Sequence, residues 1–93
     1  EMIKLKEVYI ADFYFRTEVF ISARYRYLGI IKNYKEKSLV NLAVERVLKS
    51  SYSLKEFSEC SKFYKNYRSL VSGEYKSRIE KLGEKCRKAL KKS

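Results

Sequence analysis

The sequence predicts an all-α protein, and three observations carry that prediction. Apolar residues recur at spacings of three and four along most of the chain, the period of one face of an α-helix. Proline is absent and glycine occurs three times, so the chain lacks the turn residues of a many-stranded sandwich or barrel. The 93 residues have a hydrophobic fraction of 45%, which indicates one small domain, or a fragment of a larger one, with a core rather than a disordered tail.

The first two predicted helices form a pair. The first runs roughly over residues 3–16 and is apolar over much of its circumference, so we expect it to have neighbours on more than one side. Thr17 offers a side-chain oxygen as the N-cap of the second helix. The second helix has a single apolar stripe, made of Phe20, Ala23, Tyr27, Ile30 or Ile31, and Tyr34. Polar residues 33–38 then break this helical pattern.

A second pair and a final helix follow. We expect Ser50-Ser51 to end the third helix, and Ser53 with Glu56 to form a capping box for the fourth. Gly73 separates the fourth helix from the fifth. The apolar stripes are Leu39, Leu42, Ala43, Val47 and Leu48 in the third helix, Phe57, Cys60, Tyr64, Tyr67 and Val71 in the fourth, and Tyr75, Ile79, Leu82, Cys86 and Leu90 in the fifth.

The chain repeats itself. Lys32-Asn33-Tyr34-Lys35 closes the second helix, and Lys65-Asn66-Tyr67-Arg68 closes the fourth, 33 residues later. A period near 34 residues with two helices per unit is typical of a tetratricopeptide-type solenoid. We therefore predict a tetratricopeptide-like solenoid of two helical hairpins plus a C-terminal capping helix. In this single domain of residues 1–93, the repeats cover about 1–35 and 38–71, and the cap about 74–92. The alternative is an ordinary five-helix bundle, which would carry the same stripes.

The composition argues against catalysis. Histidine is absent, which removes the commonest general base and the commonest metal ligand. No nucleophile–base pair and no phosphate-binding loop is recognisable. We therefore predict that the protein is not an enzyme and has neither a cofactor nor a small-molecule substrate.

The two cysteines, Cys60 and Cys86, each lie on an apolar stripe. The simplest interpretation is that both are small buried hydrophobic residues. A disulfide between the fourth and fifth helices requires an oxidising compartment and a suitable geometry, and we favour it less. The apolar stretches are far shorter than the about 20 residues that a bilayer requires, and the printed chain opens without a signal peptide.

The net charge is strongly positive. The chain has 22 Lys and Arg against 11 Asp and Glu, a formal charge of +11, and the excess increases towards the C-terminus. Such a charge favours a polyanionic partner, such as nucleic acid, anionic lipid or an acidic protein surface. Part of it has a second explanation, because a genome rich in A and T encodes many lysines, isoleucines, asparagines and tyrosines in any protein.

Residues 8–34 carry a resemblance to a known family. Val8-Tyr9-Ile10-Ala11-Asp12-Phe13-Tyr14-Phe15-Arg16 precedes Phe20, Ala23, Arg26, Tyr27 and Asn33-Tyr34 in order. This order resembles the C-terminal half of the BamD family, tetratricopeptide-repeat lipoproteins of the machinery that inserts β-barrels into bacterial outer membranes. Lys35 stands where the family usually has proline. The similarity covers roughly residues 5–75.

The resemblance implies a non-catalytic scaffold that binds a periplasmic POTRA domain of a BamA-like protein. It also implies a location on the periplasmic face of the outer membrane, with a lipid anchor in the full-length protein. Arg26 matches an arginine of the family's BamA-binding region. We therefore predict Arg26, together with Arg16 and Tyr25, as protein-binding residues.

Two other functions stay open. One is a small basic helical protein that binds nucleic acid; we favour it less, because most of the tyrosines belong to the apolar stripes and cannot stack on bases. The other is a generic solenoid adaptor for a different protein. A further partner compatible with the basic C-terminal run, residues 85–92, is the outer-membrane lipid surface.

Overall fold

The computed structural model describes residues 2–92, with side chains from residue 6 onward. Over this range the chain forms five α-helices and one short 3-10 turn, so the all-α prediction is confirmed. No helix among the described residues is long and apolar enough to cross a membrane. The elements are α1 (Met2–Arg16), α2 (Phe20–Asn33), α3 (Lys37–Ser53), α4 (Phe57–Tyr67), η1 (Arg68–Leu70) and α5 (Glu74–Lys92).

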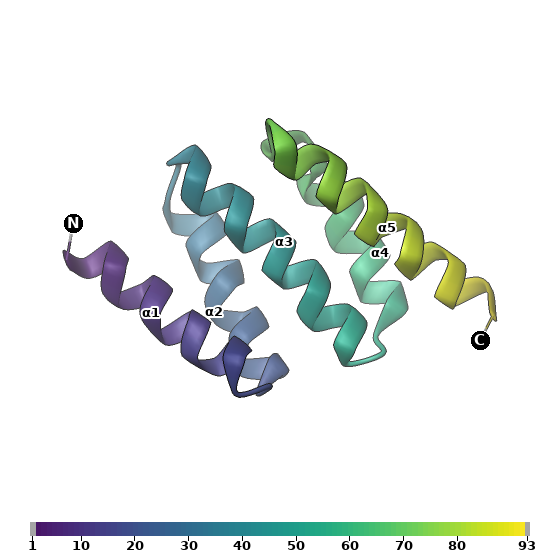
Figure 1. Ribbon diagram of the computed structural model, residues 1–93, viewed down its shortest axis with the longest axis horizontal. Helices are drawn as coiled ribbons and strands as arrows, with labels where there is room; N and C mark the ends of the chain where they lie inside the picture. The colour runs from purple at the N-terminus through teal and green to yellow at the C-terminus, as the bar shows by residue number, and fades with distance from the viewer. Residues whose placement is uncertain (1, 93) are drawn as a thin grey trace.

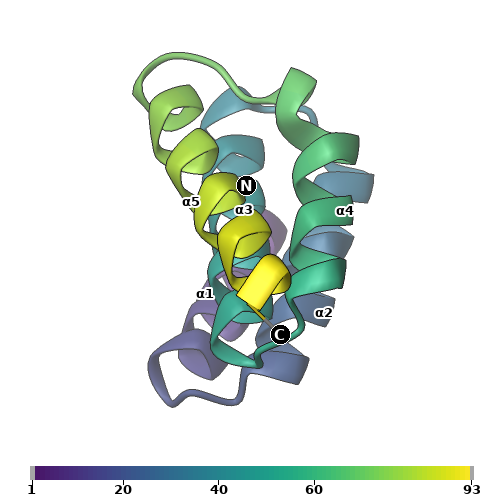
Figure 2. The same cartoon turned by 90° about the vertical axis from the view of Figure 1, so that its right-hand side faces the viewer.

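The helices lie in two layers. Helices α1, α3 and α5 lie side by side in one layer, and α2 and α4 lie behind them in the other (Figure 1 and Figure 2). Helix α2 packs against both α1 and α3, while α4 packs against α3 and α5. Each helix of the rear layer therefore covers the seam between two helices of the front layer. The described chain measures 43 × 27 × 18 Å along its principal axes.

Helix α3 is the centre of the molecule because it contributes to two apolar clusters. Small residues dominate the cluster that joins α3 to α1 and α2, which allows close approach of the helix backbones. The cluster that joins α3 to α4 and α5 consists of larger aliphatic residues and both cysteines. The buried members are Ala11, Ala23, Tyr27, Ile30, Ala43 and Val47 in the first, and Val40, Val44, Leu48, Cys60, Val71, Ile79 and Cys86 in the second.

The turns within the two hairpins share one backbone geometry. Glu18, between α1 and α2, has a φ of 64°, and Lys55, between α3 and α4, has a φ of 62°. In both turns the amide of the following residue bonds to a carbonyl five residues earlier: Val19 to Tyr14, and Glu56 to Ser51. This is how a left-handed residue ends a helix and satisfies its last carbonyls.

Three predicted helix ends are wrong. Thr17 does not cap α2; its hydroxyl donates to the carbonyl of Phe13 at 2.8 Å and so finishes α1. Ser50-Ser51 does not end α3, which continues to Ser53, and both serines are fully buried. The capping box of Ser53 and Glu56 does not form, because Ser53 is still helical and Glu56 has no side-chain cap contact. Burial of Ser50 and Ser51 overrides the stop signal that these two serines carry.

The fourth helix is also shorter than predicted. It ends at Tyr67, and η1 then leads to Val71, which is buried as expected. Asn41 of α3 holds the connection that follows, since its side-chain oxygen accepts from the Ser72 amide at 3.2 Å. This bond fixes where the chain turns towards α5.

A disulfide joins Cys60 of α4 to Cys86 of α5, with Cα atoms 6.1 Å apart. Both cysteines are fully buried, as predicted, but the preference for two separate thiols is wrong. The two helices lie antiparallel and in contact, which places the two side chains opposite each other. The fifth helix is therefore tied covalently to the second hairpin.

Candidate functional site

The outer side of α2 carries two of the three predicted protein-binding residues. The stripe of α2 that faces the core contains Ala23, Tyr27 and Ile30, and Tyr25 and Arg26 lie off this stripe and are exposed. Tyr25 is 75% exposed and Ile21, one turn earlier, is 63% exposed. Arg26 is exposed beside Tyr25. We call Ile21, Tyr25 and Arg26 the α2 surface.

A hollow of about 480 Å³ adjoins the α2 surface. Tyr25 and Arg26 line it together with residues of the second half of α2 and with Glu7 of α1. Glu7 also accepts a hydrogen bond from the Tyr34 hydroxyl at 2.6 Å, which fixes the carboxylate at the rim. The hydrogen bond to Glu7 raises the pKa of Tyr34. The α2 surface therefore exposes an aromatic ring, a guanidinium and an aliphatic side chain on one helix, from Tyr25, Arg26 and Ile21.

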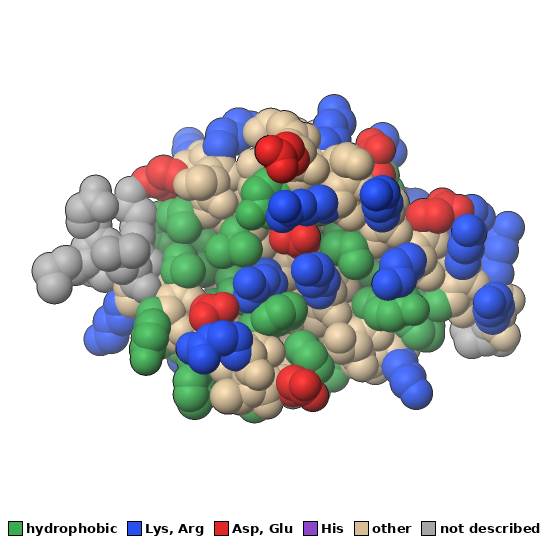
Figure 3. Space-filling view, viewed as in Figure 1, with side chains coloured by type: hydrophobic (Ala, Val, Ile, Leu, Met, Phe, Trp, Pro, Cys, Tyr) green, Lys and Arg blue, Asp and Glu red, His purple; other side chains and the backbone are tan. Residues whose placement is uncertain are grey.

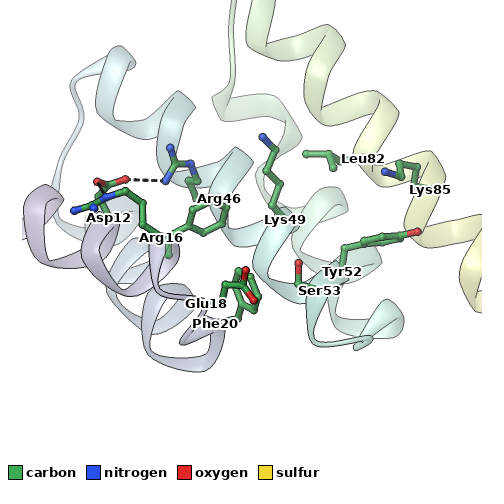
Figure 4. A pocket seen from close by; sticks show the side chains of 11 residues that line it. Asp12, Arg16, Glu18, Phe20, Arg46, Lys49, Tyr52, Ser53, Leu82 and Lys85 are labelled. Carbon is green, nitrogen blue, oxygen red and sulfur yellow. Dashed lines mark hydrogen bonds and ion pairs between the residues drawn. The ribbon is translucent and has the colours of Figure 1, made fainter.

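A second hollow lies on the opposite layer. It measures about 570 Å³ and runs across α1, α3 and α5, and we call it the α1–α3–α5 groove (Figure 4). Basic side chains alternate with apolar patches over this face (Figure 3). The residues that line the groove are Asp12, Phe15, Arg16, Glu18, Phe20, Arg46, Lys49, Tyr52, Ser53, Leu82 and Lys85.

Arg46 is the most firmly held side chain of the groove. One guanidinium nitrogen donates to an Asp12 carboxylate oxygen and to the Tyr27 hydroxyl, each at 3.1 Å. The guanidinium also lies 4.2 Å from the centre of the Phe15 ring, a cation–π distance. Arg46 of α3 therefore links the buried Tyr27 to the surface of α1.

The Asp12 carboxylate accepts hydrogen bonds from two arginines. Its second carboxylate oxygen accepts from Arg16 at 2.7 Å. The Arg16 hydrogen bond, followed by that of Arg46, lowers the pKa of Asp12 below its ordinary value despite partial burial. Burial acts in the other direction on the neighbouring phenol and raises the pKa of Tyr27. Asp12 is thus ionised and already neutralised by the groove's own arginines.

Lysines occupy the other end of the groove. Lys85 of α5 lies 4.8 Å from the centre of the Tyr52 ring, above it in Figure 4. Lys49 of α3 is 3.5 Å from the nearly buried Glu45, which also pairs with Arg78 of α5 at 3.8 Å. The cations that line the groove therefore outnumber its carboxylates, but Arg16, Arg46 and Lys49 each have a carboxylate partner.

The structure separates the three predicted residues. Arg26 and Tyr25 lie on the α2 surface, whereas Arg16 lines the α1–α3–α5 groove, and the two hollows share no residue. Sequence reasoning missed Arg46, Lys49 and Lys85 as one constellation. Arg46, Lys49 and Tyr52 do carry a signal, because spacings of three residues place them on one face of a helix. Lys85 joins them only through the fold.

Within residues 2–92, no group of three or more Asp, Glu or Cys side chains is arranged to hold a metal ion. The C-terminal cations Lys88, Lys91 and Lys92 are exposed at the end of α5, where they complement the helix dipole. Comparison with known family models, curated proteins and solved structures finds no match for this chain.

Proposed function

We propose that this protein is a non-catalytic scaffold of the outer-membrane β-barrel assembly machinery. In this proposal it resembles the C-terminal half of BamD and binds a periplasmic POTRA domain of a BamA-like protein through the α2 surface. It acts without a cofactor or a small-molecule substrate. The observation that carries the proposal is the exposure of Tyr25 and Arg26 within the segment that resembles the family.

The side chains of the α2 surface suit a protein interface. Tyrosine and arginine are the residue types that most often dominate binding energy at such interfaces. The exposed guanidinium of Arg26 can form a planar, bidentate pair with a carboxylate of the partner. Ile21 and Tyr25 add apolar area on the same side of α2, with 63% and 75% of their surfaces exposed. The α2 surface therefore offers both an anchor and a charged contact.

The proposed fold is a tetratricopeptide-like solenoid of two hairpins closed by α5. The shared backbone geometry of the turns at Glu18 and Lys55 supports the equivalence of the hairpins. Glu18 also stands where the repeat pattern prefers glycine, and its positive φ explains that preference. The tyrosines that close the two repeats, Tyr34 and Tyr67, both pack against the apolar clusters. Helix α5 adds a charged outer side, as a cap requires.

The proposed location is the periplasmic face of the outer membrane, with a lipid anchor in the full-length protein. The buried disulfide between Cys60 and Cys86 supports an oxidising compartment, because such bonds persist in the periplasm and are rare in the bacterial cytosol. The positive charge of the chain is compatible with a nearby anionic lipid surface.

The test is binding to the purified periplasmic domain of the BamA-like protein from the same organism. We expect Arg26→Ala and Tyr25→Ala each to weaken binding by about tenfold, equal to about 1.4 kcal/mol. Lys62→Ala, an exposed cation on α4, is the matched control and should bind as the parent does. Unchanged binding by both α2 variants, with unchanged far-ultraviolet circular dichroism, would remove the α2 surface from the interface.

The net charge of +11 favours one alternative, a small basic protein that binds nucleic acid. Salt separates the two functions. Phosphate-dominated binding falls steeply and log-linearly with salt concentration, whereas a packed protein interface loses less affinity. The generic-adaptor alternative predicts that the same α2 variants weaken binding to a partner other than the BamA-like domain.

A further inference from the structure

We propose that the α1–α3–α5 groove is a second binding site, which holds an acidic segment of a partner protein. The groove lies on the front layer of helices, and neither Tyr25 nor Arg26 lines it. The proposal is thus independent of the α2 surface. Its ligand is a short peptide segment that carries carboxylates and apolar side chains.

Charge is the first argument. Four cations line the groove, Arg16, Arg46, Lys49 and Lys85, against the two carboxylates of Asp12 and Glu18. Asp12 is bound between Arg16 and Arg46, and Lys49 pairs with the nearly buried Glu45 at 3.5 Å, so the cations still outnumber the carboxylates. A cleft lined by one sign of charge concentrates ligands of the opposite sign. The groove therefore selects for acidic groups.

Pre-organisation is the second argument. Asp12, Tyr27 and Phe15 hold the Arg46 guanidinium in place, so little side-chain entropy is lost when a carboxylate joins it. Lys49 is 45% exposed at its side chain and pairs with Glu45 at 3.5 Å, a long contact that leaves its ammonium open to a ligand carboxylate. The groove thus combines one firmly held guanidinium with an exposed lysine.

The third argument concerns the apolar surface between the cations. Phe20 of α2 and Leu82 of α5 line the groove and are each only partly buried. Apolar side chains of a peptide can cover this surface while its carboxylates reach the lysines. A highly charged ligand without apolar groups leaves it uncovered. The groove thus fits a segment of mixed acidic and apolar composition.

A peptide suits the groove better than a nucleic acid does. Stacking of bases needs open aromatic faces, but Arg46 covers Phe15 and Lys85 lies over Tyr52. Tyr52 also contacts the Phe57 ring, with centroids 5.4 Å apart.

The experiment measures fluorescence anisotropy with a labelled peptide of alternating Glu and Leu. The same peptide with Lys in place of Glu and a labelled single-stranded oligonucleotide serve as comparison probes. The groove variant is Lys49→Gln with Lys85→Gln. Its matched control, Lys62→Gln with Lys65→Gln, removes the same charge from exposed positions on α4.

We expect saturable binding of the Glu peptide and not of the Lys peptide. The groove variant should lose about tenfold in affinity, the sum of two exposed charge contacts, and the control and Arg26→Ala should each change it by less than about twofold. Lys49→Arg with Lys85→Arg, which keeps the charge, should retain binding even if the glutamine variant is less stable.

Three outcomes would overturn the proposal. One is absence of saturable binding to the Glu peptide. Another is equal loss in the groove variant and the α4 control, which would reveal general charge attraction. The last is tighter binding of the oligonucleotide with loss in the groove variant, which would make nucleic acid the occupant.

Discussion

The two sides of α3 are stabilised in different ways. On the side of α1 and α2, alanines allow close helix contact around one large ring, Tyr27, and polar contacts through Arg46 reach the surface. On the side of α4 and α5, aliphatic residues such as Leu48 and Ile79 surround a disulfide. The first side is stabilised by the packing and hydrogen bonding of the buried Tyr27 ring, and the second by aliphatic packing and the disulfide.

The two sides also differ in what they leave open. The first hairpin exposes large apolar side chains on both helices, with Tyr9 67% exposed on α1 and Tyr25 75% exposed on α2. Helix α1 packs against α2 and shares an apolar cluster with α3, as its apolar pattern predicted. Its remaining side is open, and Phe13 there is 48% exposed. The second hairpin exposes less. Exposed apolar surface is therefore greater on the half that has no covalent tie.

The largest expected effect on stability comes from truncating the buried Tyr27 ring. Tyr27→Ala should lower the free energy of unfolding by about 3–5 kcal/mol, as truncation of a fully buried aromatic residue does. Urea unfolding followed by circular dichroism measures the change. Tyr25→Ala, two residues away on the same helix but exposed, should stay within about 0.5 kcal/mol. Equal losses in the two variants would show that α2 faces the core differently.

The covalent bond ranks next. Cys60→Ala with Cys86→Ala should lower the free energy of unfolding by about 2–4 kcal/mol, because the bond closes a chain segment with a sequence separation of 26. A reductant should destabilise the parent under unfolding conditions and leave the double variant unchanged. Two free thiols in the oxidised parent, titrated under denaturing conditions, would refute the bond.

Alanine substitutions at one glycine in each half should change the free energy of unfolding in opposite directions. A Cβ at Gly83 of α5 would lie 2.7 Å from the Tyr64 ring, whereas a Cβ at Gly29 of α2 would meet nothing within 4 Å. Gly83→Ala should therefore destabilise by about 1–3 kcal/mol, and Gly29→Ala should stabilise by up to about 1 kcal/mol. Urea midpoints of the two variants should move in opposite directions. A shift in the same direction would contradict the close contact of α4 and α5.

The smallest effect is the pH dependence of the polar contacts on the first side. The pKa of Asp12 is lowered from 3.8 in the folded chain by Arg16 and Arg46, so the ionised form stabilises the fold. This contribution is present above pH 3.8 and is lost as the pH falls through the lower folded value. Asp12→Asn should cost about 0.2–1 kcal/mol near neutral pH and less in acid. A difference from the parent that stays constant with pH would contradict the pairing.

Much of the fold follows from the sequence because stripes at helical spacing survive any tertiary arrangement. Ala23, Tyr27 and Ile30 are buried as the pattern of α2 predicts. Helix ends are harder, since they depend on local competition. Ser51 reads as a stop signal, but it is buried and accepts a hydrogen bond from Arg24 of α2 at 3.1 Å. That contact spans two helices and has no local signature.

The candidate sites divide in the same way. Exposure of Tyr25 and Arg26 follows from one helix, because both lie off its apolar stripe. The α1–α3–α5 groove joins Asp12, Arg46 and Lys85 from three helices, and their proximity depends on how those helices align. The disulfide likewise needs the relative position of α4 and α5, which sequence periodicity does not contain.

The most direct test of the proposed scaffold function is a nuclear magnetic resonance titration. The isotope-labelled chain is titrated with the unlabelled periplasmic domain of the BamA-like protein, and amide shifts are followed along all five helices. We expect shifts concentrated at Ile21, Tyr25 and Arg26, with α4 unchanged. Absence of shifts at saturating partner, or shifts confined to α4 and α5, would contradict it.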